Sequence, residues 1–157
     1  MGTPSICELN MNILKRLSII LCFISFGVMA NENPNQTIRG NWEINHIAFP
    51  STFIQASTAK ALKLTRANNR ALVNISVIDI SNQTRIPVKV KVTGKIQNLV
   101  GTNKSLDFVE VDEKDAIYYL SQLKYANEET FRFFIQIKDP KTGRIEEIKF
   151  LQKMWVD

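Results

Sequence analysis

Residues 66–80, RANNRALVNISVIDI, join a basic, asparagine-rich start to an apolar strand pattern. Every second residue from 73 to 77 is Val or Ile, while Leu72 and Ile78 are apolar on the other face. A strand that is apolar on both faces usually lies inside a sheet rather than at its edge. We therefore predict that residues 71–80 form the central strand of the core, with polar side chains gathered where this strand begins.

Period-two alternation recurs on both sides of this strand and predicts further strands. In residues 86–96 the apolar side chains alternate with a lysine-rich face, and Gly94 predicts a bulge. The segment DPKTG, residues 139–143, is a strong hairpin signal because Pro and Gly suit its corners. The predicted strands are residues 42–49, 71–80, 86–96, 106–111, 116–125, 131–137 and 145–156.

One short helix is predicted over residues 57–64, which start with hydroxyl side chains and continue with good helix formers. About seven short strands, regular turns, one helix and no repeat indicate the all-β class. Among all-β folds we predict an immunoglobulin-like antiparallel β-sandwich. The paired cysteines that mark antibody domains are absent from it.

The N-terminus has the three-part pattern of a secretory signal peptide. Lys15 and Arg16 precede the apolar run of residues 17–28, and small residues then lead to Ala30. The run is shorter than the roughly 20 residues of a membrane span, so we predict cleavage after Ala30 and no stable membrane insertion. An uncleaved anchor is the alternative. The domain plan is a signal peptide over residues 1–30, a flexible linker over 31–38 and a single β-sandwich domain over 39–157.

Composition argues against several classes of function. Both cysteines, Cys7 and Cys22, lie in the predicted leader, and His46 is the chain's single histidine. A structural zinc site needs four ligands, typically Cys and His, so we predict no metal and no cofactor. A nucleophilic triad has no cysteine or serine motif to build on. The formal net charge of +5 is spread along the chain, so we predict no nucleic-acid partner.

The polar cluster before the central strand is the first candidate binding site. Arg66 and Arg70 could hold an anion or a carboxylate, with Asn69 and His46 as further polar groups. The alternative is that the arginines pair with groups of their own domain and fix the loop. A lone histidine on a half-apolar strand face is more often a packed residue than a ligand.

Two aromatic residues are candidates for an exposed contact. Tyr118 and Phe134 fall on the faces opposite the main apolar stripes of their strands. The remaining nearby aromatic side chains are expected to fill the core or to pair across strands.

Several segments resemble a family of small exported proteins of Gram-negative bacteria that is known only as a domain of unknown function. The resemblance covers nearly all of the chain after Gly40 and implies a periplasmic β-sandwich with no established activity. It is carried by residues 46–54 (HIAFPSTFI), 66–77, 115–119 (DAIYY), 127–133 (NEETFRF) and 155–157 (WVD).

Three functions follow from these observations. The first is a non-enzymatic module of the cell envelope that binds another envelope protein or peptide, favoured by the small β-sandwich and the missing catalytic set. The alternative is a small-ligand or anion binder that uses the Arg/Asn cluster. The least favoured is a hydrolase built from scattered carboxylates, which would need two of them to converge in a cleft.

Overall fold

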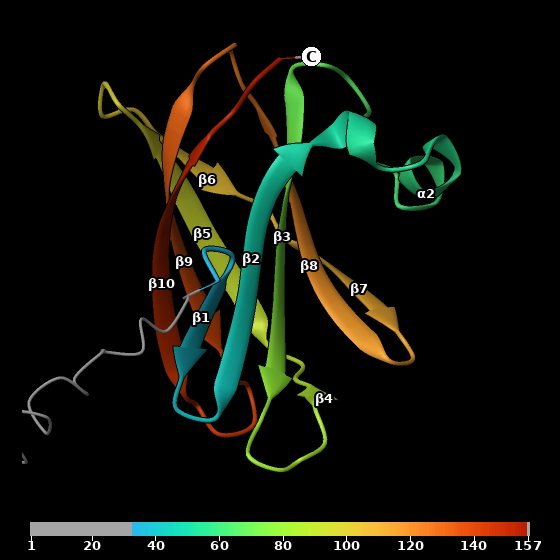
Figure 1. Ribbon diagram of the computed structural model, residues 1–157, viewed down its shortest axis with the longest axis vertical. Coiled ribbons are helices and arrows are strands. Elements are labelled where there is room, and N and C mark those ends of the chain that lie inside the picture. The colour runs from blue at the N-terminus through green and yellow to red at the C-terminus, as the bar shows by residue number, and fades with distance from the viewer. Residues whose placement is uncertain (1–32, 157) are drawn as a thin grey trace, which may run out of the picture. The chain divides into compact units, whose positions relative to one another are not determined.

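Two antiparallel β-sheets face each other across one hydrophobic core (Figure 1). The computed structural model describes residues 33–156, so the predicted signal peptide lies outside the described residues. Sheet A has the order β1-β2-β3-β8-β7, with β4 paired to β3, and sheet B has the order β10-β9-β5-β6. The strands of sheet A are β1 Gln36–Arg39, β2 Trp42–Pro50, β3 Arg70–Asp79, β4 Ile86–Pro87, β7 Val109–Glu113 and β8 Ala116–Lys124. The strands of sheet B are β5 Lys91–Asn98, β6 Asn103–Leu106, β9 Thr130–Lys138 and β10 Ile145–Lys153.

Strand β3 is the interior strand that its sequence predicts. It pairs with β2 on one side and with β8 on the other. Val73, Ile75 and Val77 are fully buried toward sheet B, and Leu72 is buried on the opposite face of the same strand. A 3₁₀-helix, Ser51–Phe53, contacts β3. Apolar side chains on both faces therefore suit β3 to this central place.

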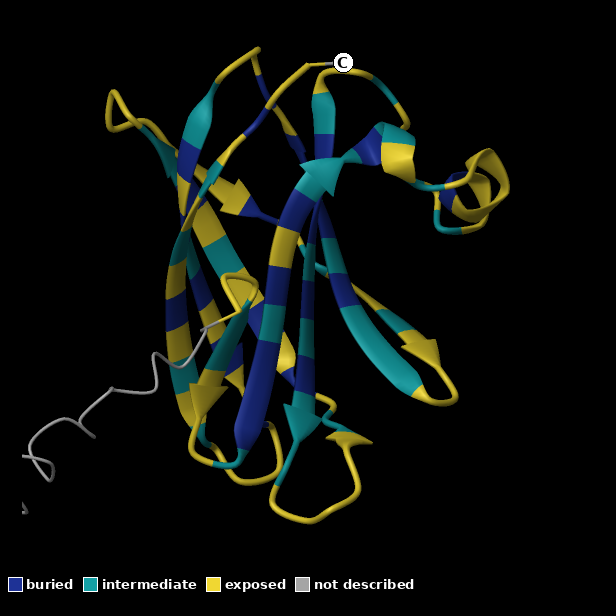
Figure 2. Cartoon of the chain, in the orientation of Figure 1, coloured by how far each residue is buried: buried dark blue, intermediate teal, exposed yellow. Residues whose placement is uncertain are grey.

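The strand order confirms the all-β, immunoglobulin-like sandwich. Without the short strands β1 and β4, the order β2-β3-β8-β7 reproduces the A-B-E-D sheet of immunoglobulin domains. In the same way β10-β9-β5 reproduces their G-F-C sheet. Buried and exposed residues alternate along β9 (Figure 2), as expected for a strand with one face on the core.

Two predicted strands are wrong because the chain crosses from one sheet to the other within them. Residues 86–96 divide into β4, which pairs with β3 in sheet A, and β5, which begins sheet B at Lys91. Residues 106–111 divide at Phe108, since β6 pairs with β5 and β7 pairs with β8. Alternation continues through the first crossing and therefore does not reveal which sheet each part joins. At the second crossing the apolar positions change phase between Phe108 and Val109.

Three smaller predictions also need correction. Residues 36–38, predicted as linker, begin β1, which pairs with β2. Gly94 stays in continuous register with both neighbours of β5 and forms no bulge. The helix α2 spans Ala56–Ala61, earlier than predicted, and its N-cap Gln55 makes no side-chain capping bond. The sequence pattern did not indicate β1, because an edge strand with polar residues on both faces shows no apolar alternation.

The predicted hairpin between β9 and β10 is present. The carboxylate of Asp139 accepts hydrogen bonds from the Lys141 N–H at 2.8 Å and from the Thr142 hydroxyl at 2.7 Å. Gly143 has a positive φ of 75°, a conformation that glycine adopts without a steric penalty. The Thr142 hydroxyl bond is the main reason that the pKa of Asp139 lies below its ordinary value. The turn fixes β10 as the outer strand of sheet B.

Candidate functional site

A cationic and aromatic row crosses the outer face of sheet B. Phe134 on β9 lies directly between Lys95 on β5 and Lys149 on β10 in the strand register. The two ammonium nitrogens lie 5.5 Å and 5.8 Å from the centre of the Phe134 ring. Both distances fall within the range of cation–π attraction. The ring is thus held between two positive charges on a face that no other described strand or helix covers.

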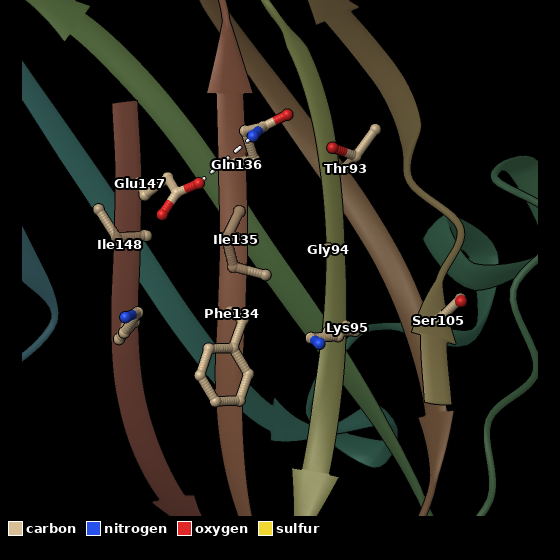
Figure 3. A pocket seen from close by; sticks show the side chains of 10 residues that line it. Thr93, Gly94, Lys95, Ser105, Phe134, Ile135, Gln136, Glu147 and Ile148 are labelled. Carbon is tan, nitrogen blue, oxygen red and sulfur yellow. Dashed lines mark hydrogen bonds between the residues drawn. The ribbon is translucent and has the colours of Figure 1, made fainter. Parts of the chain in front are cut away.

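The row borders a shallow depression with a volume of about 500 Å³ (Figure 3). Its floor and margins include short or polar side chains from all four strands of sheet B, among them Thr93 and Ser105. The side-chain amide of Gln136 donates a hydrogen bond to Glu147 at 3.4 Å across its upper margin in Figure 3. Such a surface offers an apolar ring, hydrogen-bonding groups and cations within one concave area.

Positive charge dominates this face well beyond the depression. Alternation along β5, β9 and β10 directs their lysine and arginine side chains outward, where the register sets them beside one another. Glu147 is the one carboxylate among the outward side chains of these three strands. The outward basic residues are Lys91, Lys95, Arg132, Lys138, Lys149 and Lys153. The charge that looks dispersed in the sequence is therefore gathered by the fold.

Gly94 lies behind this depression and packs closely against β9. A Cβ at this position would approach Ile135 Cδ1 to 2.6 Å and the carbonyl oxygen of Phe134 to 3.0 Å. It would also meet the Phe108 ring at 3.4 Å. The missing side chain therefore lets β5 and β9 approach with the Ile135 and Phe108 side chains beneath them. This close approach explains the glycine that the sequence pattern assigned to a bulge.

The arginine cluster does not form the predicted site. Arg66 is exposed and donates a hydrogen bond to the Thr52 carbonyl at 2.9 Å, so it supports the loop. The backbone carbonyl of Asn69 accepts a bond from the Tyr125 N–H at 3.0 Å. Arg70 is the first residue of β3 and pairs with Lys124 of β8. Its place in the alternation of β3 puts it on the face of sheet A that points away from the core. These residues hold the loop before β3, and none of them borders the hollow of about 170 Å³ that His46 lines.

His46 lies inside the sandwich, with 4% of its surface exposed. Its ring stacks on Phe150 of sheet B at 4.5 Å, and its Nε2 lies 3.0 Å from the Thr37 hydroxyl of β1. The other ring nitrogen, Nδ1, is buried without a partner among the described residues. Burial lowers the pKa of His46 because the charged form would lose its hydration. His46 is thus a neutral core residue, separated by the β2–β3 sheet from the outward Arg70.

The two predicted aromatic contacts lie on opposite sides of the sandwich. Phe134 faces outward from sheet B and forms the centre of the cationic row, as alternation predicts. Tyr118 borders a smaller hollow of about 140 Å³ on sheet A, together with Arg85. Sequence analysis missed Lys95 and Lys149 as site residues. The lysine face of residues 89–95 was the available signal, but its closeness to Phe134 depends on pairing between distant strands.

Two carboxylates approach another hollow, of about 240 Å³, beside the β3–β4 loop. Asp79 accepts hydrogen bonds from the Ser81 N–H at 2.7 Å and from Asn41 at 3.0 Å. The bonds to Ser81 are the main reason that the pKa of Asp79 lies below its ordinary value. Asp139 serves the β9–β10 turn in the same way. Both carboxylates therefore brace turns, which gives the hydrolase hypothesis no converging pair here.

A family model described as a domain of unknown function, DUF4426, matches residues 36–157. The chain belongs to the DUF4426 family. This result confirms the resemblance drawn from the sequence segments. A crystal structure of a DUF4426 family protein from Pseudomonas aeruginosa PAO1 is similar, with 27% identity and a TM-score of 0.68. The match covers 78% of this chain and 94% of the other. No curated protein matches the DUF4426 chain.

Two structures of FetP from uropathogenic Escherichia coli strain F11 share the fold of this DUF4426 chain. One is a copper-bound variant, with 10% identity and a TM-score of 0.56 over 76% of this chain and 93% of that chain. The other, expressed in the periplasm of E. coli BL21(DE3), has 10% identity and a TM-score of 0.55 over 76% and 92%. Identity this low supports a likeness of fold alone.

Residues 33–156 contain no group of three His, Cys, Asp or Glu side chains placed to hold a metal. His46, the single histidine of the chain, is buried in the core with its Nε2 beside Thr37. In the same part of the chain, no helix is long and apolar enough to cross a bilayer.

Proposed function

We propose that this DUF4426 protein is a non-enzymatic binding module of the cell envelope that takes an acidic, extended segment of another envelope protein. The binding surface is the outer face of sheet B. The observation that carries this proposal is the row in which Phe134 lies between Lys95 and Lys149. Two cations beside a half-buried, outward-facing ring suit a ligand that alternates carboxylates with apolar side chains.

The spacing of the cations favours a chain over a small anion. Lys91 and Lys95 are four residues apart on β5, which separates them by about 13 Å along the strand. A phosphate or a single carboxylate would reach one end of this face, whereas an extended peptide reaches several lysines. The carboxylate of Glu147 lies within the same face and interrupts its positive charge. An alternating peptide can place an apolar side chain there, whereas a nucleic acid carries a phosphate at every step. These features support a peptide rather than a nucleic acid.

Two observations support a place in the envelope. The first is the signal-peptide pattern that ends at Ala30, which predicts export to the periplasm. The second is that FetP, which shares the fold, was recombinantly expressed in the periplasm of E. coli BL21(DE3). A small β-sandwich with an exposed cationic face is suited to act as an accessory that docks onto a larger envelope protein.

A defined peptide tests the proposal. The probe is a fluorescein-labelled peptide of alternating Glu and Leu, compared by fluorescence anisotropy with its Gln–Leu counterpart. We expect Lys95→Glu to weaken binding by roughly 5- to 10-fold, since an attraction becomes a repulsion at an exposed site. Phe134→Ala should weaken it by on the order of tenfold through loss of the aromatic surface. Lys114→Glu in the exposed β7–β8 turn carries the same charge change and should bind like the wild type.

Three results would contradict the proposal. Equal losses in Lys95→Glu and Lys114→Glu would mean that net charge alone attracts the peptide. Tighter binding of a single-stranded oligonucleotide of equal charge would assign the face to nucleic acid. Full competition by free glutamate at the concentration of the peptide would instead favour a small-anion site.

A further inference from the structure

Strand β10 leaves a long edge of sheet B unpaired. It spans nine residues, Ile145–Lys153, and pairs with β9 along its whole length. The strand order of the sheet ends at β10, and no other strand of residues 33–156 pairs with it. Ile145 and Leu151 point outward near its two ends and expose 51% and 60% of their surfaces. An edge with free backbone groups and exposed apolar side chains is a template for another strand.

The outward side chains of β10 are complementary to themselves when the strand is reversed. In chain order they are Ile145, Glu147, Lys149, Leu151 and Lys153. Lys153 reaches past the paired segment, because pairing centred on residue 148 places it opposite Gly143 in the turn before β10. An antiparallel copy centred on residue 148 places each Ile145 opposite Leu151 of the second copy. It also places each Glu147 opposite Lys149 of the second copy, twice by symmetry. Directly opposed apolar pairs and opposite charges are the pairs that stabilise antiparallel strands.

We propose that two copies of this protein associate by antiparallel pairing of their β10 strands about a two-fold axis at Ile148. The two four-stranded sheets B then form one continuous sheet. The interface is isologous, because each copy contributes the same strand. Edge pairing supplies backbone hydrogen bonds, and the Ile–Leu and Glu–Lys pairs supply the specificity.

Charge selects this register over its neighbours. Moving the alignment by two residues in one direction places Lys149 opposite Lys149 of the second copy. Moving it by two residues in the other direction places Glu147 opposite Glu147. Like charges that are directly opposed destabilise a strand pair, and a shift by one residue would place outward residues opposite inward ones. The register centred on Ile148 therefore pairs outward residues with outward residues and also places opposite charges opposite each other.

Charged residues on an edge strand often serve to prevent pairing. A protective edge gains most from charges that repel an identical strand. Here Glu147 and Lys149 are spaced so that self-pairing brings opposite charges together. Both side chains are exposed and away from the core, which leaves them available to a second copy. The dimer would place two Phe134 rows on one continuous face, although strand pairing does not depend on peptide binding there.

Charge-reversal variants, measured singly and in an equimolar mixture, test the dimer. Protein expressed from the full chain is measured by sedimentation velocity over a concentration series, alone and as variants. We expect a concentration-dependent dimer for the wild type. Glu147→Lys and Lys149→Glu should each weaken self-association by on the order of tenfold or more, since each brings two like-charged pairs together. Glu113→Lys in β7 is the matched control and should dimerise normally.

An equimolar mixture of the Glu147→Lys and Lys149→Glu variants should recover the dimer. In that heterodimer the two substituted side chains face each other with opposite charges, and an unchanged Glu147–Lys149 pair forms on the other side of the axis. The double variant Glu147→Lys/Lys149→Glu should also dimerise. A wild type that stays monomeric over the series would overturn the proposal, and so would single variants that dimerise as the wild type does. Recovery in the mixture shows that both single variants are folded.

Discussion

The guanidinium of Arg144 lies 4.1 Å from the centre of the Trp42 ring. This contact joins the two sheets, because Trp42 begins β2 in sheet A and Arg144 closes the hairpin before β10 in sheet B. Arg144 also donates to Asn41 Oδ1 at 2.7 Å and to the Arg39 carbonyl at 2.6 Å. The Arg144 side chain thus supplies hydrogen-bond donors to two acceptors of the β1–β2 turn. It also covers the indole ring at that end of the sandwich.

Replacing this arginine should destabilise the fold even when the charge is kept. Arg144→Lys retains a cation but loses the planar fork that reaches both the Asn41 side chain and the Arg39 carbonyl. We expect the free energy of unfolding to fall by about 2 kcal/mol, the sum of a weakened cation–π contact and lost charged hydrogen bonds. Urea denaturation measures the change. Arg132→Lys on the outer face of β9 is the control, and an equal loss in both variants would contradict this role.

Filling the space at Gly94 should strain the contact between β5 and β9. Gly94→Ala places a methyl group against Ile135 Cδ1 and the Phe134 carbonyl, and overpacking of this kind costs about 1–3 kcal/mol. The second change, Ile135→Val, removes the Cδ1 atom with which the new methyl group collides. We expect the double variant to lose less stability than the two single changes combined. Strict additivity in this double-mutant cycle would show that the predicted collision does not occur.

The burial of His46 should make stability depend on pH. Because burial lowers its pKa in the folded state, the unfolded chain, with a histidine pKa of about 6.5, binds more protons as the solution is acidified. The free energy of unfolding should therefore fall below about pH 6.5, until the pH passes the lower pKa of the folded state. The variant His46→Gln keeps a polar group near Thr37 but cannot titrate.

Urea denaturation of the wild type and of His46→Gln at about pH 7.5 and about pH 5 isolates this contribution. Other ionisable groups act on both proteins, so the difference between them reports His46. We expect the wild type to lose more stability on acidification than the variant. Identical losses would mean that the buried ring titrates alike in the folded and unfolded chains.

Local patterning predicted most of the strands and the direction of their side chains. Alternation placed His46 with the buried face of β2 and Phe134 on the outward face of β9, and both lie there. Pro140 and Gly143 predicted the hairpin that fixes β10. These features depend on neighbours within a few residues, which is the range that a periodic pattern reports.

The candidate site could be predicted only in part. The outward direction of Phe134 and the lysine face of β5 are both visible in the sequence. Their meeting in one row depends on the pairing of β5 with β9 and of β9 with β10. The predicted cluster of Arg66, Arg70 and His46 failed because His46 faces the core from β2, whereas Arg70 faces the other side of the same sheet.

Alternation and turn chemistry are enough to establish the β class, the central place of β3 and the hydrophobic face of each long strand, because each depends on residues that are near one another in the chain. Short segments of the sequence also carried the resemblance to the family that the family model confirms. The pairing of distant strands was needed to show that the chain changes sheets after Pro87 and again near Phe108. It also decided that dispersed lysines share one face with Phe134. Strand pairing joins residues far apart in the chain, and the free energy that selects one pairing comes from packing the whole core.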